Sequence, residues 1–123
     1  MRWLAHGNIS PAAIEAIARH GHAVQTTAEL LPAAEVIDLD DLLQQAQKEQ
    51  LDVLTTEKSL AGRPYETKAR FGRAMVFLQL TGGEVEQDDA IDRLFARYKS
   101  PKPGMLYTVT ENRVKVRQLP GFK

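Results

Sequence analysis

The sequence predicts an α/β fold in which helices cover both faces of a mostly parallel sheet. Three observations support this fold class. Short apolar segments that suit strands alternate with longer segments of helical periodicity. Residues 74–80 form a continuous apolar run, which is typical of a strand buried on both faces. Two alternating segments flank Glu111 and Asn112 and predict a hairpin. We therefore expect a three-layer α/β/α sandwich that ends in a β-hairpin.

The first half of the chain is expected to hold three strands and two helices. Ser10 can cap the first helix, and Pro11 suits its first position, where the missing N–H costs nothing. Gly21 can adopt the positive φ that often ends a helix. Asp38 is a second capping residue. Pro32 interrupts the segment 28–36, where we expect a loop with a helical turn. The expected elements are a strand at 3–5, a helix at 11–19, a strand at 22–26, a helix at 38–50 and a strand at 51–55.

The second half begins with a polar segment, 56–72, that glycine and proline punctuate. We expect a long loop here, with a helical piece near Glu66, and long loops in compact domains are often functional. The buried strand 74–80 follows. A helix is expected to begin at Asp88 or Asp89 and to end before Pro101. The hairpin strands at 105–110 and 113–119 complete the order.

Length and composition favour one domain spanning residues 1–123. The chain is 43% hydrophobic and 26% charged, as in ordinary globular proteins. No apolar run approaches the roughly 20 residues of a membrane span, and the N-terminal residues do not resemble a secretory signal. Cysteine is absent, which excludes disulfides and thiolate catalysis. We expect a cytoplasmic protein that does not bind membranes.

Charge is balanced in total but uneven along the chain. Sixteen basic side chains match sixteen acidic ones. Between residues 29 and 57 every charged residue except Lys48 is acidic. From residue 93 onward every charged residue except Glu111 is basic. Such asymmetry can serve a polyanion or an acidic partner. The alternative is that the opposite blocks pair with each other, or face water, within one fold.

Ligands of a parallel sheet bind beyond the carboxyl ends of its strands. In this sequence those ends are residues 6–8, 55–59 and 81–83. Four stretches that include the first two ends, taken in order, resemble the small PIN-like domains that are related to VapC-type toxin ribonucleases. They are the opening 2–11 (RWLAHGNISP), the step 19–24 (RHGHAV), the helix and strand end from Asp41 to Leu60, and the closing strand 112–120 (NRVKVRQLP).

The resemblance implies a PIN-like fold and a site built for metal-dependent RNA cleavage. That chemistry requires clustered carboxylates to hold Mg²⁺ or Mn²⁺. The sequence departs from the family pattern at these positions. His6 stands where the first-strand Asp is expected, Gly7 replaces the adjacent acid, and Ser59 replaces an Asp of the loop motif. Glu57 keeps an acid one methylene longer, and Asp41 matches the helix acid to within about a residue.

The candidate catalytic positions implied by the resemblance are therefore His6, Asp41, Glu57 and Ser59. Asp41 and Glu57 are the candidate ligands of a weakened site for Mg or Mn, although an imidazole such as that of His6 suits Zn, Mn or Ni better. The alternative is that His6 fills a decayed acid site and hydrogen-bonds a neighbour.

A cluster of bases follows the third strand and could contact a phosphate backbone; its members are Lys58, Arg63, Lys68, Arg70 and Arg73. Tyr65 and Phe71 lie among these bases and could stack on nucleobases. The alternative is a solvated loop whose aromatic side chains enter the core. The candidate substrate-binding residues are Asn8, Thr55, Lys58, Arg63, Lys68 and Arg70.

These features lead to three hypotheses about function. The first is a catalytically impaired PIN-like domain that binds RNA or an antitoxin-like protein partner. The second is an active divalent-metal-dependent ribonuclease with an altered ligand set. The third is a protein-interaction domain. The helical stripe of Ile91, Leu94, Phe95 and Tyr98 is expected in the core, with a homodimer face as its alternative.

Overall fold

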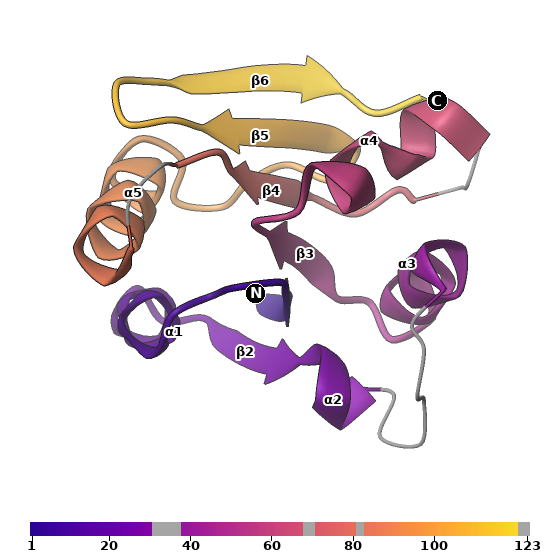
Figure 1. The fold of residues 1–123 in the computed structure, drawn as a ribbon, viewed down its shortest axis with the longest axis horizontal. Helices are drawn as coiled ribbons and strands as arrows, with labels where there is room; N and C mark the ends of the chain where they lie inside the picture. Colours follow the sequence, from indigo (N-terminus) through magenta and orange to yellow (C-terminus); the bar gives the residue numbers. More distant parts are fainter. Residues whose placement is uncertain (31–37, 68–70, 81–82, 121–123) are drawn as a thin grey trace.

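Six strands form one sheet in the order β2-β1-β3-β4-β5-β6 (Figure 1). The structure is a computed structural model, and it describes residues 1–30, 38–67, 71–80 and 83–120. The strands are β1 (Arg2–His6), β2 (Ala23–Thr26), β3 (Asp52–Thr55), β4 (Met75–Leu78), β5 (Met105–Val109) and β6 (Val114–Gln118). The described helices are α1 (Pro11–Arg19), α2 (Thr27–Leu30), α3 (Leu39–Lys48), α4 (Lys58–Thr67) and α5 (Glu84–Arg97).

The sheet is parallel from β2 to β5, and β6 is antiparallel to β5. Helical crossovers join the parallel strands, whereas a tight turn is enough to join β5 to β6. The α/β class, the mostly parallel sheet and the closing hairpin are therefore confirmed. The predicted hairpin turn is also present, because the Thr110 N–H donates to the Arg113 carbonyl at 2.9 Å.

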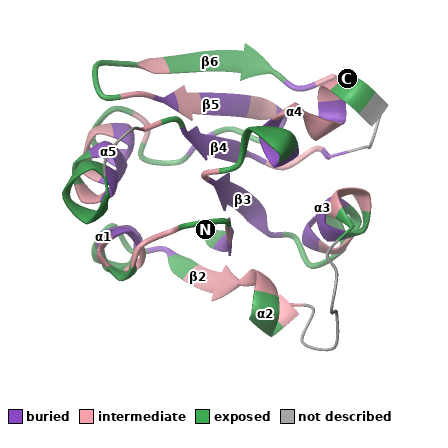
Figure 2. Cartoon of the chain, in the orientation of Figure 1, coloured by how far each residue is buried: buried purple, intermediate pink, exposed green. Residues whose placement is uncertain are grey.

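Helices lie on both faces of the sheet because successive strand side chains point to opposite sides. Trp3 and Leu54 belong to a core cluster with α1 and α5. Their neighbours Leu4 and Val53 belong to a second cluster with α3 and α4. Every residue of β3 and β4 is buried, as expected for central strands (Figure 2). None of the helices in the described ranges combines the length and the apolar character that a membrane span requires.

The capping residues act as the sequence predicts. Ser10 Oγ accepts a hydrogen bond from the Ala13 N–H at 3.1 Å, which satisfies a free donor in the first turn of α1. Asp38 Oδ1 accepts from the N–H groups of Asp40 and Asp41 at 2.9 and 3.2 Å. Both helices therefore begin within a residue of their predicted positions.

Two predictions of local structure are wrong. The helical piece expected near Glu66 is present, but it is the end of a longer helix, α4, that covers residues 58–67 of the predicted loop although Pro64 lies inside it. Burial explains this helix, because Leu60, Ala61 and Pro64 are buried beside the sheet at helical spacing. Helix α5 begins at Glu84, four or five residues before the predicted start at Asp88 or Asp89, and its N-cap Gly83 provides no side-chain hydrogen bond. Acids in the first turn stabilise its positive end instead.

The strand bounds also shift slightly. β1 extends to His6, and β4 is shorter than the predicted 74–80. In the segment predicted as a loop with a helical turn, α2 supplies the turn at 27–30, and the remainder lies outside the described residues.

Candidate functional site

The strand order reverses direction between β1 and β3, which makes their carboxyl ends the topological switch point. From β1 the chain continues to β2 on one side, while β3 pairs with the other side of β1. In open α/β sheets the ligand crevice lies at this point. The last residues of the two strands, His6 and Thr55, are directly paired in register. The structure thus brings together two of the predicted strand ends.

A hydrogen-bonded cluster of three residues occupies this point. His6 Nδ1 lies 2.8 Å from Thr55 Oγ1. The same hydroxyl accepts a bond from the Glu57 N–H at 2.9 Å. Thr55 is fully buried, whereas the Glu57 side chain is exposed. The buried hydroxyl therefore orients the imidazole and begins the turn into α4.

Burial favours a neutral His6. The Thr55 hydroxyl accepts from the Glu57 N–H and has a second lone pair and one proton, so the tautomer of His6 decides which partner donates in the bond between Nδ1 and Oγ1. Burial lowers the pKa of His6 below its ordinary value, and the negative charge of Glu57 raises it in part. At neutral pH His6 is thus an uncharged side chain at the position where the resemblance expects a carboxylate.

The turn after β1 requires glycine. Gly7 has a φ of +84°, and a Cβ there would lie 2.5 Å from Thr56 Oγ1 and 2.9 Å from Glu57 Cγ. The close approach lets Thr56 Oγ1 accept from the Asn8 N–H at 2.8 Å. The Thr56 N–H donates to the His6 carbonyl at 3.3 Å. An acid at position 7 would push these two strand ends apart.

Gln87 is a residue of the site that the sequence analysis missed. Its amide bridges two backbone groups, since Oε1 accepts from the Ser10 N–H and Nε2 donates to the Asn8 carbonyl, both at 2.8 Å. Gln87 is buried on the face of α5 that also carries Ile91 and Leu94. A polar residue at that core-facing spacing is the sequence signal that could have revealed it.

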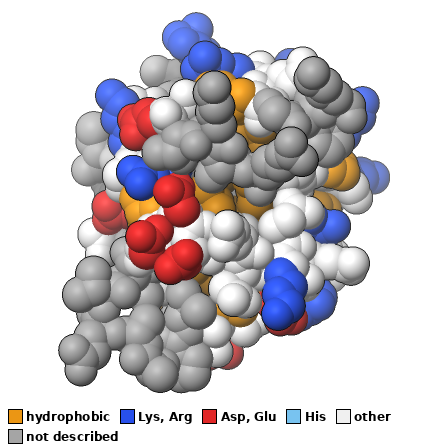
Figure 3. Space-filling view, turned by 90° about the vertical axis from the view of Figure 1, so that its right-hand side faces the viewer, with side chains coloured by type: hydrophobic (Ala, Val, Ile, Leu, Met, Phe, Trp, Pro, Cys, Tyr) orange, Lys and Arg blue, Asp and Glu red, His pale blue; other side chains and the backbone are white. Residues whose placement is uncertain are grey.

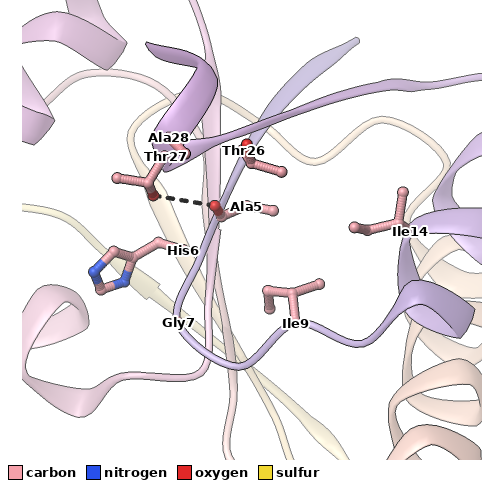
Figure 4. A pocket seen from close by; sticks show the side chains of 8 residues that line it. All are labelled: Ala5, His6, Gly7, Ile9, Ile14, Thr26, Thr27 and Ala28. Atoms are coloured by element: carbon pink, nitrogen blue, oxygen red, sulfur yellow. Dashed lines mark hydrogen bonds between the residues drawn. The ribbon is translucent and has the colours of Figure 1, made fainter. Parts of the chain in front are cut away.

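An open pocket of about 260 Å³ borders the cluster. Figure 4 shows Ile9 and Ile14 on one side of β1 and the ring of His6 on the other. Thr26 also lines the pocket, and Thr27 Oγ1 donates to the Ala5 carbonyl at 3.2 Å. This end of the sheet, the carboxyl edge, therefore presents an apolar hollow on one side of β1 and the polar imidazole of His6 on the other.

The remaining predicted acid-site positions, Asp41 and Ser59, are exposed side chains on α3 and α4. Asp41 lies in the first turn of α3, and Ser59 lies near the start of α4. Within the described ranges, no hydrogen bond or ion pair joins either residue to His6, and no three His, Asp or Glu side chains are placed to hold a metal ion. The described donors therefore do not match the oxygen-rich site that Mg²⁺ prefers.

The predicted basic cluster is divided by the fold. Lys58 is exposed at the carboxyl edge. Arg63 pairs with Asp40 of α3, Nε to Oδ1, at 2.9 Å. Arg73 faces Asp52 at the opposite, amino edge, at 3.5 Å. Lys68 and Arg70 lie outside the described residues.

The two aromatic residues of this segment are engaged inside the protein. Phe71 is buried in the core. Tyr65 donates its hydroxyl to the Gln118 carbonyl at 2.9 Å, and the Arg117 guanidinium lies 4.2 Å from its ring centroid. Phe71 is therefore not available for stacking on a nucleobase, and Tyr65 has one face covered.

The comparisons with known proteins add no relative. No family model, no curated protein and no solved structure matched the chain. The candidate site consequently rests on its own geometry and on the motifs in the sequence.

Proposed function

We propose that this chain is a PIN-like domain that binds single-stranded RNA at the carboxyl edge of its sheet without metal-dependent cleavage. The proposal unites the motif order in the sequence with helices on both faces of a mostly parallel sheet. The observation that carries it is the bond between His6 and Thr55, at the position where the resemblance requires a metal-binding acid.

The surroundings of His6 support binding rather than metal chemistry. A mostly neutral imidazole and the threonines of the edge supply uncharged hydrogen-bonding groups. The pocket beside them is smaller than most ligand pockets, which suits one planar group the size of a nucleobase. Lys58 supplies a cation at the start of α4 for the phosphate backbone. An extended strand crossing β1 would contact both sides of the edge.

A direct test measures binding and cleavage on the same RNA. Purified protein is mixed with a fluorescent single-stranded RNA, with and without Mg²⁺ or Mn²⁺. We expect binding that weakens with salt, and an RNA that stays intact. Lys58→Ala is expected to weaken binding about threefold to tenfold and to reduce the salt slope by about one. Lys48→Ala, an exposed lysine of α3, is the matched control and should bind as the wild type does.

The main alternative, an active ribonuclease with altered ligands, draws on the proximity of Glu57 to His6. The carboxylate is close enough to raise the imidazole pKa, so the two side chains could share a cation. Robust metal-dependent cleavage by the wild type, lost in Glu57→Gln, would establish this alternative and refute the binding-only proposal.

A further inference from the structure

The outer strand β6 presents an open edge of the sheet. It lies at the end of the strand order, and β5 is its neighbour. Four of its five residues are exposed, in contrast to the fully buried β3 and β4. Figure 2 shows this exposure along most of the strand. An unpaired edge offers backbone donors and acceptors to another strand.

The hydrogen-bond pattern identifies which groups of β6 face outward. Bonds at both ends of the hairpin involve odd-numbered residues, with Arg113 O accepting from Thr110 and Leu119 N donating to Gly104. Antiparallel ladders alternate, so the backbone groups of the even-numbered residues of β6 point away from β5. The Gln118 carbonyl is already bonded to Tyr65. Among the residues that the structure describes, Val114 and Val116 therefore carry the unpaired backbone groups of this edge.

The edge is also cationic on one face. The hairpin and its turn hold three bases, Arg113, Lys115 and Arg117, against the single acid Glu111. Within the described residues, no carboxylate forms an ion pair with any of the three bases. Figure 3 shows Lys and Arg side chains along the top of the molecule, at the height of β6 in Figure 1.

The other face of the strand is apolar. Val114 packs against the core cluster of α1 and α5, and Val116 shares its face with 39% of its surface exposed. Lys115 and Arg117 point to the opposite face, where Arg117 covers Tyr65 of α4. A strand added to this edge would meet cations on one side and valines on the other, with a period of two residues.

We propose that β6 binds an extended acidic segment of a partner protein, in which acidic and β-branched apolar residues alternate. The segment would continue the sheet as a seventh strand, with its carboxylates beside Lys115 and Arg117. Main-chain hydrogen bonds to Val114 and Val116 hold the segment on the sheet, and the positive charges of Lys115 and Arg117 select an acidic partner. This surface is independent of the RNA-binding proposal.

Charge argues against a second copy of this chain as the occupant. Two β6 strands paired edge to edge would bring their Lys and Arg side chains together, and like charges on paired strands are destabilising. The same charges that hinder self-association favour an acidic strand. RNA would match the charge but cannot continue the hydrogen-bonded ladder, so it serves as a competing outcome in the test.

The experiment uses a short capped peptide of alternating Glu and Val as its probe. Its binding to the full isotope-labelled chain is followed by NMR amide shifts and by fluorescence anisotropy. Two matched peptides test the chemistry, one with Lys in place of Glu and one with N-methylated central amides that cannot pair. A short oligouridylate tests the RNA alternative.

We expect the Glu/Val peptide to shift the amides of residues 113–118 and both matched peptides to bind at least about tenfold more weakly. Val116→Pro removes an outward N–H and should cause a similar loss. Lys115→Glu should weaken binding about threefold or more, and Lys48→Glu, on exposed α3, should have no effect.

The proposal is overturned by any of four results. They are no binding at about millimolar peptide, equal binding of the Lys/Val or N-methylated peptide, shifts centred away from β6, and tighter binding of oligouridylate than of the Glu/Val peptide to the β6 edge. The N-methylated peptide keeps the test valid even if Val116→Pro fails to fold.

Discussion

At the scale of single residues, the carboxyl edge depends on a few positions whose backbone and side chains have little freedom. Gly7 allows the ends of β1 and β3 to approach each other, and Thr55 then bonds both His6 and Glu57. Neither position tolerates a larger or less polar side chain without moving the others. Two predictions follow from these contacts.

The first prediction compares two glycines that share a positive φ. Gly7 and Gly21 have φ values of +84° and +85°, but a Cβ at Gly21 would meet nothing within 4 Å. Gly21→Ala should therefore lower the free energy of unfolding by about 1 kcal/mol, from backbone strain alone. Gly7→Ala should cost about 2 kcal/mol more, because the new Cβ overlaps Thr56 and Glu57. Denaturant unfolding measures both, and equal losses would contradict the steric account.

The second prediction concerns the titration of His6. Burial lowers its pKa, so the unfolded chain binds a proton near pH 6.5 while the native ring resists it. The contribution of His6 to the free energy of unfolding is therefore fully present above about pH 6.5, and it is lost as the pH falls through the native pKa. Glu57→Gln should lower the pKa of His6 further, as followed by NMR. Glu49→Gln, which changes an exposed acid after α3, should leave it unchanged.

At the scale of elements, helices α1 and α5 are coupled to the turn after β1 by one buried amide. Gln87 bonds both Asn8 and Ser10, and Arg19 of α1 pairs with Asp88 of α5 at 2.7 Å. The ion pair is largely exposed, so it contributes little. The buried amide is the stronger link, because removing it leaves a backbone donor and acceptor without partners.

The third prediction tests this link. Gln87→Met keeps the size of the side chain but loses both hydrogen bonds, and it should cost about 2 kcal/mol of unfolding free energy. Gln44→Met, at an exposed position of α3, should change stability by less than about 0.5 kcal/mol. The comparison uses chemical unfolding of both variants. Equal stability of the two variants would show that water replaces the bonds of Gln87 at little cost.

At the scale of the whole molecule, the carboxyl ends and the amino ends of the parallel strands carry different chemistry. The carboxyl edge gathers neutral polar groups around His6. The amino edge holds a buried carboxylate, Asp52, which accepts from the Ala74 N–H at 2.9 Å and faces Arg73. Its Oδ2 atom has no hydrogen-bond partner among the described residues. Burial raises the pKa of Asp52, more than Ala74 and Arg73 lower it.

The fourth prediction follows from that raised pKa. The unfolded chain loses the proton of this carboxyl near pH 4, while native Asp52 keeps it to higher pH. Ionisation of native Asp52 therefore removes stability as the pH rises from about 4 through the native pKa. Asp52→Asn should flatten this part of the curve of unfolding free energy against pH. Asp41→Asn, at an exposed site, should leave it as in the wild type, and a steeper slope in Asp52→Asn would contradict the burial argument.

The acidic and basic blocks of the sequence do not form ion pairs with each other among the described residues. Part of the acidic block pairs within the fold, since Asp40 meets Arg63 and Asp52 meets Arg73. The bases of β6 have no such pairing among the described residues. Internal ion pairs thus account for two acids of the middle of the chain, and the open cationic edge is where a partner is proposed.

The sequence by itself determined the fold class, the approximate positions of the six strands along the chain and the caps of α1 and α3, because these depend on local periodicity and on short side chains beside their own backbone. It also identified His6 and Thr55 as strand ends. Only the tertiary structure decided that residues 58–67 are helical, since burial of Leu60 and Pro64 outweighs the breaking tendency of proline. It likewise decided which charged side chains form ion pairs. Arg63, Arg73 and Gln87 find partners at least 21 residues away along the chain, and such contacts arise from the packing of whole elements.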